Sequence, residues 1–229
     1  MTTFALLPGS WHGAWCFERL LPELAARGHD GVALDLPWAS WDAGLAECAA
    51  AVVAALDGRD GDLVVVAHSM SGVVLPLVAA ARAPRRMVFL AAEVPEPGLS
   101  WDETAERHPG FLYPGIGDGQ VGDDSGRSRW ADQAKATARL YQLCDPADAA
   151  WAFSRLDWQA WTTQQQPCPL ERWPEVPSTV VVCSQDRAVR PEWLRAAARR
   201  IGADLAELAS DHSPFLSAPA ALAELLDRL

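Results

Sequence analysis

A short strand that turns sharply into a helix is the feature that most constrains the fold of this chain. Residues 63–66 read Leu-Val-Val-Val, typical of a buried strand, and an apolar helical stretch begins just after Gly72. Between them lies Ser69, with the small residues Ala67 and Ser71 two positions to either side. A strained turn of this kind brings strand and helix close together, so only small residues fit, and it presents the serine hydroxyl above a parallel sheet. The pattern predicts Ser69 as a nucleophile; the alternative is a pair of helix-capping serines.

Two later loops carry the groups that a serine nucleophile needs. Asp186 follows a strand-like run at 178–184, and His212 follows a shorter one at 204–209. Because the carboxyl ends of parallel strands share one edge of a sheet, we expect both side chains near Ser69. The order serine, acid, histidine is that of an α/β-hydrolase. We predict that His212 is the general base and acid, and that Asp186 orients its imidazole and stabilises the cation.

Charge that develops on a substrate carbonyl oxygen needs fixed hydrogen-bond donors. The backbone N–H of Met70, directly after the predicted nucleophile, is one expected donor. The loop after the first predicted strand, residues 8–13 with the sequence Pro-Gly-Ser-Trp-His-Gly, is expected to supply the second.

That loop resembles the first-strand loop of the small α/β-hydrolases that include plant methylesterases, hydroxynitrile lyases and bacterial esterase-like relatives. The family commonly reads His-Gly-x-x-His-Gly-x-Trp; here Pro8 replaces the first histidine and Gly9 keeps the glycine. The resemblance implies that the N–H of Ser10 completes the oxyanion hole. Hydroxynitrile lyases of this type carry a lysine after the catalytic histidine, whereas Ser213 stands here, which argues against cyanohydrin cleavage. Further matching segments are 90–95, 145–151, 185–189 and 211–215.

The order of predicted elements and the resemblance give the same fold class. We predict an α/β protein with the α/β-hydrolase fold, in which a predominantly parallel six-stranded sheet is flanked by helices. Residues 1–92 and 175–229 are expected to form the core, and residues 93–174 an inserted cap. Within the cap, Asp118-Gly119 predicts a hairpin turn, and 129–142 and 145–157 predict helices.

The predicted cap is rich in tryptophan. It holds six of the eleven in the chain: Trp101, Trp130, Trp151, Trp158, Trp161 and Trp173. Packing of a small subdomain would explain them, but six together also suit the wall of an apolar pocket. From the cap, Trp130, Trp158 and Trp161 are predicted to bind substrate, together with Trp11 of the first-strand loop.

Glu93 follows the predicted strand at 86–91, where relatives usually have an apolar residue. One interpretation is a solvated loop carboxylate. The other is a carboxyl that faces the pocket and contacts substrate or adds an acid or base, and on that interpretation Glu93 joins the predicted substrate-binding residues.

Composition excludes several kinds of partner. The net charge of −11 argues against nucleic acid and anionic membrane surfaces. No run of 18 apolar residues and no basic segment before the first strand is present, so neither a membrane span nor a signal peptide is predicted. Five cysteines without C-x-x-C spacing suggest reduced thiols, and the five histidines show no metal-ligand spacing. We expect a cytoplasmic protein with a small-molecule substrate and without metal or cofactor; nothing indicates a homo-oligomer.

These observations favour a cofactor-free serine hydrolase that cleaves a carboxylic ester, lactone or thioester with an apolar moiety. A second hypothesis is a lyase or cyclase on the same fold, in which the His–Asp pair acts as acid and base. A third is a non-catalytic receptor for a small molecule. The receptor is less favoured because binding alone requires none of the three residues Ser69, Asp186 and His212.

Overall fold

The computed structural model describes residues 1–59 and 61–229, and in them six strands form one sheet with the order β2-β1-β3-β4-β7-β8. All five neighbouring pairs are parallel. The predicted six-stranded parallel sheet and the α/β-hydrolase fold are confirmed. The strands are β1 Thr3–Leu7, β2 Asp30–Ala33, β3 Leu63–His68, β4 Arg86–Leu90, β7 Ser178–Cys183 and β8 Asp204–Leu208.

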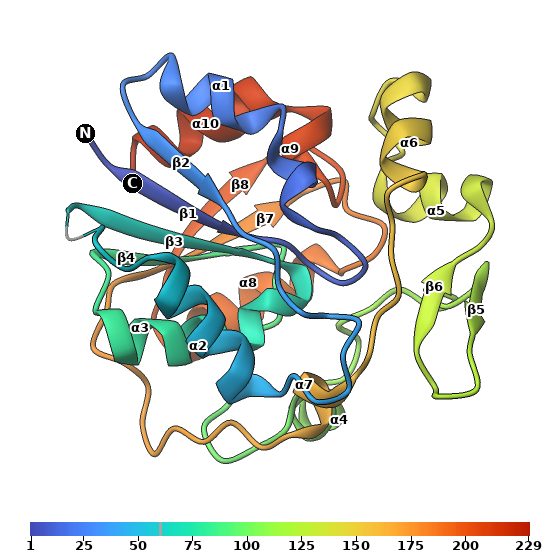
Figure 1. The fold of residues 1–229 in the computed structure, drawn as a ribbon, viewed down its shortest axis with the longest axis horizontal. Helices are drawn as coiled ribbons and strands as arrows, with labels where there is room; N and C mark the ends of the chain where they lie inside the picture. Colours follow the sequence, from blue (N-terminus) through green and yellow to red (C-terminus); the bar gives the residue numbers. More distant parts are fainter. Residues whose placement is uncertain (60) are drawn as a thin grey trace.

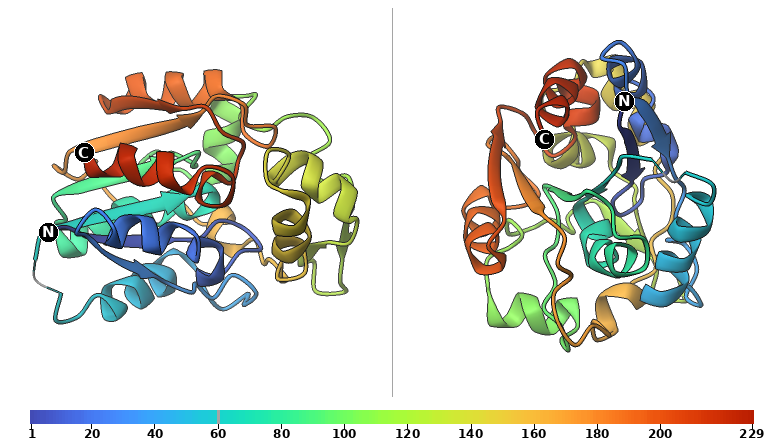
Figure 2. Two further views of the ribbon diagram at one scale, coloured as in Figure 1. Left: turned by 90° about the horizontal axis from the view of Figure 1, so that it is seen from above. Right: turned by 90° about the vertical axis from the view of Figure 1, so that its left-hand side faces the viewer.

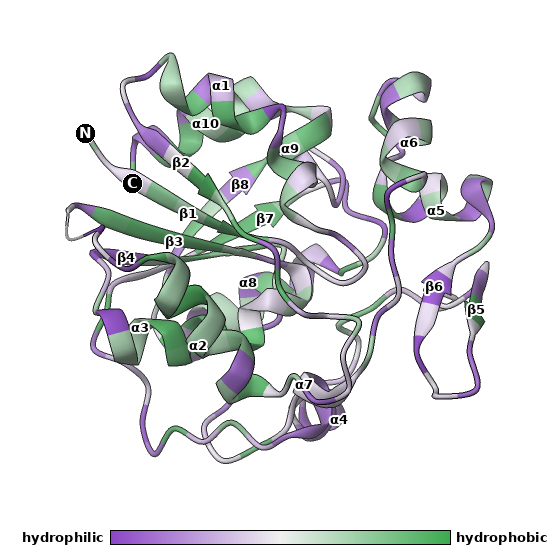
Figure 3. Ribbon diagram, viewed as in Figure 1, coloured by the Kyte–Doolittle hydropathy of each residue, from purple (hydrophilic) through white to green (hydrophobic). Residues whose placement is uncertain are grey.

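Helices cover both faces of the sheet (Figure 1). On one face lie α1 (Leu20–Ala25) and α10 (Pro219–Asp227), and on the other lie α2 (Leu45–Ala55), α3 (Leu75–Arg82) and α8 (Pro191–Ile201). The internal strands β3 and β7 are buried along their whole length, which is consistent with their valine runs at 64–66 and 180–182 (Figure 3). None of the helices in the described residues is both long enough and apolar enough to span a bilayer.

The segment between β4 and β7 lies beyond the carboxyl ends of the strands and along the side of α2 (Figures 1 and 2). Its elements are α4 Trp101–Arg107, β5 Gln120–Gly122, β6 Ser128–Trp130, α5 Gln133–Leu140, α6 Pro146–Phe153 and α7 Thr162–Gln165. The strands β5 and β6 form a small antiparallel hairpin. This segment therefore faces the edge of the sheet at which Ser69, Asp186 and His212 emerge.

Local details differ from the sequence-based expectations. The hairpin turns at residues 123–127, where Asp123 accepts hydrogen bonds from the N–H groups of Ser125 and Arg127, and not at Asp118-Gly119. Gly119 instead closes the open end of the hairpin, because its carbonyl accepts from the N–H of Ala131. The predicted helix at 129–142 begins only at α5, since residues 128–130 pair in the hairpin.

The sequence also predicts a helix over about 13–27, after the first strand, and in the structure this helix is divided. A short 3-10 helix, η1 (Ala14–Phe17), is followed by α1, which begins at Leu20. Pro22 lies in the first turn of α1, where its missing N–H costs no hydrogen bond, and a helix running through it from residue 13 would lose one. The mostly apolar run at 32–36 predicts the second strand, whereas β2 begins two residues earlier, at Asp30, and ends at Ala33.

Candidate active site

Ser69 occupies a strained turn between β3 and a 3-10 helix, η2 (Ser69–Val73), with a backbone φ of 53°. Non-glycine residues rarely adopt such a positive φ. Glycines occupy the two tightest positions around this turn. A Cβ on Gly72 would lie 2.0 Å from the carbonyl oxygen of Glu93, and one on Gly9 would lie 2.7 Å from the Cβ of Ser69. The sequence therefore places a serine where the backbone is strained and where its neighbours leave no space for larger residues.

Ser71, two positions after Ser69, has a separate role in this turn. Its Oγ lies 2.8 Å from the carbonyl oxygen of His68 and 3.1 Å from that of Leu7, so the hydroxyl can donate to either. The side chain is fully buried. Ser71 thus ties the turn to β1 and does not face the pocket that contains Ser69.

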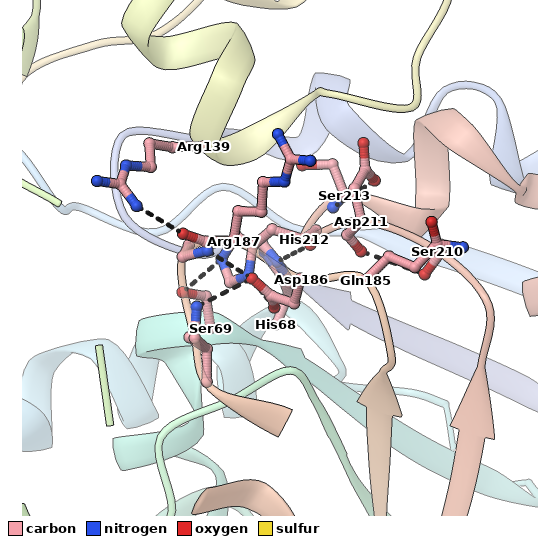
Figure 4. A network of polar contacts seen from close by, with 12 residues as sticks. His68, Ser69, Arg139, Gln185, Asp186, Arg187, Ser210, Asp211, His212 and Ser213 are labelled. Carbon is pink, nitrogen blue, oxygen red and sulfur yellow. Dashed lines mark hydrogen bonds and ion pairs between the residues drawn. The ribbon is translucent and has the colours of Figure 1, made fainter. Parts of the chain in front are cut away.

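The structure brings Ser69, His212 and Asp186 together in a chain of hydrogen bonds (Figure 4). The Oγ of Ser69 lies 3.2 Å from Nε2 of His212, and Nδ1 of His212 lies 2.7 Å from Oδ2 of Asp186. With Nδ1–H donating to the carboxylate, Nε2 is free to accept the serine proton. The three residues come from the ends of β3, β7 and β8, as expected from their positions in the sequence.

Backbone donors hold Asp186 in place. Its Oδ1 accepts from the N–H groups of Ala188 and Val189, at 2.7 and 2.9 Å, while Oδ2 remains for His212. Hydrogen bonds of this kind hold a carboxylate in one orientation. The carbonyl of His212 in turn accepts from Nε2 of His68 at 2.9 Å. Burial lowers the pKa of His68 well below its usual value, with smaller effects from His212 and His12, so His68 is neutral.

Ser10 and Met70, the residue after Ser69, are in contact with each other. The Oγ of Ser10 donates to Sδ of Met70 at 3.3 Å. Within the described residues, the N–H of Ser10 donates to no protein acceptor. Met70 is the second residue of η2, and N–H groups in a first helical turn have no acceptor within the helix. Both groups are therefore available to bind a ligand oxygen.

His12 anchors the loop that carries Ser10. Its Nδ1 donates to the carbonyl of Ser10, and its Nε2 accepts from the hydroxyl of Tyr141, each at 2.7 Å. Burial lowers the pKa of His12 to about 4, offset in part by the bond to Ser10 and assisted by the nearby His212. The sequence contained a signal for His12 in the loop motif, but none for Tyr141, which lies 129 residues further along the chain.

A chamber of about 660 Å³ opens above Ser69. Its aromatic walls are Trp11, Trp101, Phe111 and Trp161, and Ser10, Ser69 and His212 also line it. Its remaining polar lining includes Glu93, Asp102 and three glutamines, and no lysine or arginine is among the described residues that line it. The chamber thus combines aromatic and aliphatic walls with a substantial set of uncharged and acidic polar groups.

Two predicted substrate-binding residues do not line this chamber. Trp130 is buried behind the wall and packs edge-on against Trp11. Trp158 lies at a separate cavity on the outer side of the first-strand loop, where Arg129 stacks over its ring at 4.8 Å. Trp11, Glu93 and Trp161 do line the chamber, as does Trp101, which the sequence did not single out. The tryptophan count gave no information about which rings point inward.

The interpretation of Glu93 as a solvated loop carboxylate is wrong. The residue is only 4% exposed and lines the chamber. Its backbone N–H donates to the carbonyl of Ser69 at 3.0 Å, which holds the residue directly against the strained turn. Nε2 of Gln164 donates to Oε1 of Glu93 at 2.7 Å, and Oε2 has no partner among the described residues. Burial raises the pKa of Glu93 well above its usual value; the hydrogen bond from Gln164 offsets part of this and Asp102 adds to it, so the neutral carboxyl is favoured.

No cluster of three or more histidine, cysteine, aspartate or glutamate side chains that could hold a metal ion occurs in residues 1–59 and 61–229.

A model of the alpha/beta hydrolase family matches residues 4–225. The chain belongs to this family. It is 28% identical to Salicylic acid-binding protein 2 from Nicotiana tabacum, over 98% of this chain and 95% of the relative. It is 26% identical to the alpha/beta hydrolase nvfD from Aspergillus novofumigatus, over 93% and 90%. Methyl jasmonate esterase 1 from Vitis vinifera is 25% identical over 99% and 95%.

Solved structures agree on the fold. A polyneuridine aldehyde esterase mutant superposes with a TM-score of 0.84 at 20% identity, covering 99% of this chain and 98% of that one. At this identity the likeness concerns the fold alone. Together with its distant sequence relatives, the family places the chain among esterase-like α/β-hydrolases.

Proposed function

We propose that this protein hydrolyses a carboxylic ester, lactone or thioester with an apolar moiety, with Ser69 as nucleophile. The observation that carries the proposal is the hydrogen-bonded chain Ser69–His212–Asp186, whose Ser69 and His212 line a chamber with four Trp and Phe side chains in its walls. The relatives named as esterases support the reaction class. Binding alone would need no such chain, which disfavours a receptor.

The reaction would proceed through an acyl-enzyme. Nε2 of His212 accepts the proton of Ser69 as Oγ attacks the substrate carbonyl, and Asp186 stabilises the imidazolium. The N–H groups of Ser10 and Met70 donate to the oxygen that becomes negative. His212 then gives the proton to the leaving alcohol or thiol, and a water molecule that His212 activates releases the acid. The 3.2 Å separation of Oγ and Nε2 is at the long end of hydrogen bonding, as is usual before substrate binds.

The chamber favours substrates with hydrocarbon or aromatic parts. Trp11, Trp101 and Trp161 supply broad apolar walls, and apolar area removed from water stabilises binding by about 25 cal/mol per Å². No lysine or arginine among the described lining residues could pair with an anionic substituent. Esters that carry a second negative charge should therefore bind poorly.

The test is a pair of serine variants assayed on p-nitrophenyl esters. Ser69→Ala should lower kcat/KM by about 10³-fold or more and abolish labelling by a fluorophosphonate, because triad members act as a unit. Ser71→Ala is the matched control and should keep most activity, since its hydroxyl bonds only to backbone carbonyls. The reverse result, an inactive Ser71→Ala and an active Ser69→Ala, would show that the wrong serine was assigned.

A lyase or cyclase is the second candidate, and the buried carboxyl of Glu93 in the chamber is the observation that favours it. A protonated carboxyl near the nucleophile could add an acid to the His–Asp pair. Labelling of Ser69 without turnover of any ester would favour this candidate. Product analysis by mass spectrometry separates the two, since hydrolysis adds one water to the substrate and cyclisation or elimination does not.

A further inference from the structure

Glu93 is a buried carboxyl whose hydrogen bonding is incomplete. Gln164 of α7 supplies one donor to Oε1, and Oε2 is buried without a partner among the described residues. Leaving a polar atom buried and unpaired costs free energy, so such atoms are commonly paired once a ligand or water is bound. The residue lines the same chamber as Ser69 and His212. The unpaired oxygen thus belongs to a site that is built to receive a ligand.

Two features of the chamber indicate what could pair with this oxygen. The described lining residues include no lysine or arginine that would hold Glu93 as a carboxylate. Asp102 of α4, the other carboxyl that lines the chamber, opposes ionisation of Glu93. A neutral carboxyl presents an O–H donor, and its best partner is an uncharged acceptor such as a ketone, amide or ether oxygen.

We propose that Glu93, positioned by Gln164, is a specificity-determining residue that donates a hydrogen bond to an uncharged oxygen on the apolar part of the substrate. The proposal rests on the proposed ester hydrolysis and narrows its substrates to esters with a ketone, amide or ether oxygen away from the scissile bond. Aromatic walls would hold the hydrocarbon part, and Glu93 would select among chains of equal length by the polar group they carry.

The experiment compares p-nitrophenyl hexanoate with p-nitrophenyl 5-oxohexanoate and its 4-oxo isomer. The ratio of kcat/KM for the oxo ester to that for the plain ester measures selectivity and cancels changes in the Ser69 chemistry. We expect this ratio to exceed one in the wild-type protein for at least one of the two oxo isomers. Glu93→Leu, which has a similar volume and no polar atom, should lower that ratio about tenfold, the size expected for one buried hydrogen bond.

Glu93→Gln tests the donor itself. A glutamine keeps an oxygen for Gln164 and an N–H₂ donor for the ligand, so it should restore most of the ratio lost in Glu93→Leu. Glu106→Gln, an exposed carboxylate on α4 outside the chamber, is the control and should leave activity unchanged. Thermal unfolding of each variant shows that it is folded.

A binding measurement separates this proposal from the ester hydrolysis on which it rests. In the Ser69→Ala background, quenching of tryptophan fluorescence reports binding of the same esters without turnover, because three tryptophans line the chamber. If wild type cleaves no ester but the Ser69→Ala protein still prefers the oxo esters and loses that preference with Glu93→Leu, the reaction is wrong and the role of Glu93 stands.

Two results would overturn the role of Glu93. One is an unchanged ratio in Glu93→Leu in both kinetics and binding. The other is a preference for p-nitrophenyl 6-aminohexanoate over all neutral esters that disappears in Glu93→Gln, since this would show an ionised carboxylate that pairs with a cation.

Discussion

Protonation of His12 should make the folded protein sensitive to mild acid. The ring is 5% exposed, and its neutral form makes two hydrogen bonds, to the carbonyl of Ser10 and from the hydroxyl of Tyr141. A buried imidazolium would lose its water and meet no carboxylate in these contacts. Burial accordingly lowers the pKa of His12 from 6.5 to about 4.

The size and sign of the effect follow from linkage. Above pH 6.5 both folded and unfolded chains carry a neutral His12, so it contributes no pH dependence. Between pH 6.5 and 4 the unfolded chain binds the proton and the folded one does not, so stability falls as the pH falls. Each pKa unit corresponds to 1.36 kcal/mol, which gives a loss of about 2 kcal/mol by pH 5 and about 3 kcal/mol by pH 4.

The assay is urea unfolding at pH 7.5 and pH 5 for wild type, His12→Asn and Tyr141→Phe. Asparagine keeps a donor for the carbonyl of Ser10 but cannot titrate, and it leaves the Tyr141 hydroxyl without its partner. We expect His12→Asn to be about 1–2 kcal/mol less stable than wild type at pH 7.5. That gap should shrink by about 2 kcal/mol at pH 5, because only wild type bears the cost of the buried proton.

Comparing variants with wild type cancels the contribution of the other titrating groups to the pH dependence of stability. His68, whose pKa is also lowered by burial, and Glu93, whose pKa is raised and whose effect has the opposite sign, are present in every protein tested. Tyr141→Phe removes the same hydroxyl bond but keeps the imidazole, so its gap to wild type should not shrink in this way. A gap between wild type and His12→Asn that stays constant from pH 7.5 to 5 would refute the reasoning.

Three further outcomes follow from the site. Gly72→Ala should destabilise the fold by about 2 kcal/mol or more, measured by thermal unfolding, because its Cβ would lie 2.0 Å from the carbonyl oxygen of Glu93; Gly61→Ala, with open space around its Cβ, should not. Asp186→Asn should lower kcat/KM by about 10³-fold or more, since the amide cannot serve as the anionic partner of His212; near-normal rates would mean that another acid orients the imidazole. Activity on p-nitrophenyl esters should rise with acyl length until the chamber is full; fastest turnover of the acetate or of a dianionic ester would show that apolar contacts do not govern binding.

Positions that depend on local sequence were predictable from it. Ser69, Asp186 and His212 each follow a strand, and parallel strands bring their carboxyl ends to one edge whatever the intervening chain does. The strands themselves were visible because buried parallel strands are continuous runs of apolar, often β-branched residues, as in β3 and β7. Their catalytic roles stay predictions, which the serine and aspartate variants test.

Positions that depend on packing of distant segments were not predictable. Trp130 and Trp161 are both tryptophans of the inserted segment, yet only Trp161 reaches the chamber, because Trp130 packs behind Trp11. Burial of Glu93 depends on its backbone bond to Ser69 and on Gln164, a residue 71 positions away. Periodicity and composition carry no information on such contacts, since each is set by how the insert docks on the core.

Two neighbouring hydrogen bonds connect the inserted segment directly to the candidate active site. Tyr141 bonds to His12, which holds the Ser10 loop, and the N–H of Leu143 donates to Oδ2 of Asp211 at 2.9 Å. Asp211 directly precedes His212, and its Oδ1 accepts from Ser217. One short stretch after α5 therefore contacts both the loop that contains Ser10 and the loop that contains His212. If the proposed reaction holds, a displacement of residues 141–143 should disturb the Ser10 loop and the His212 loop together, because hydrogen bonds join this stretch to both.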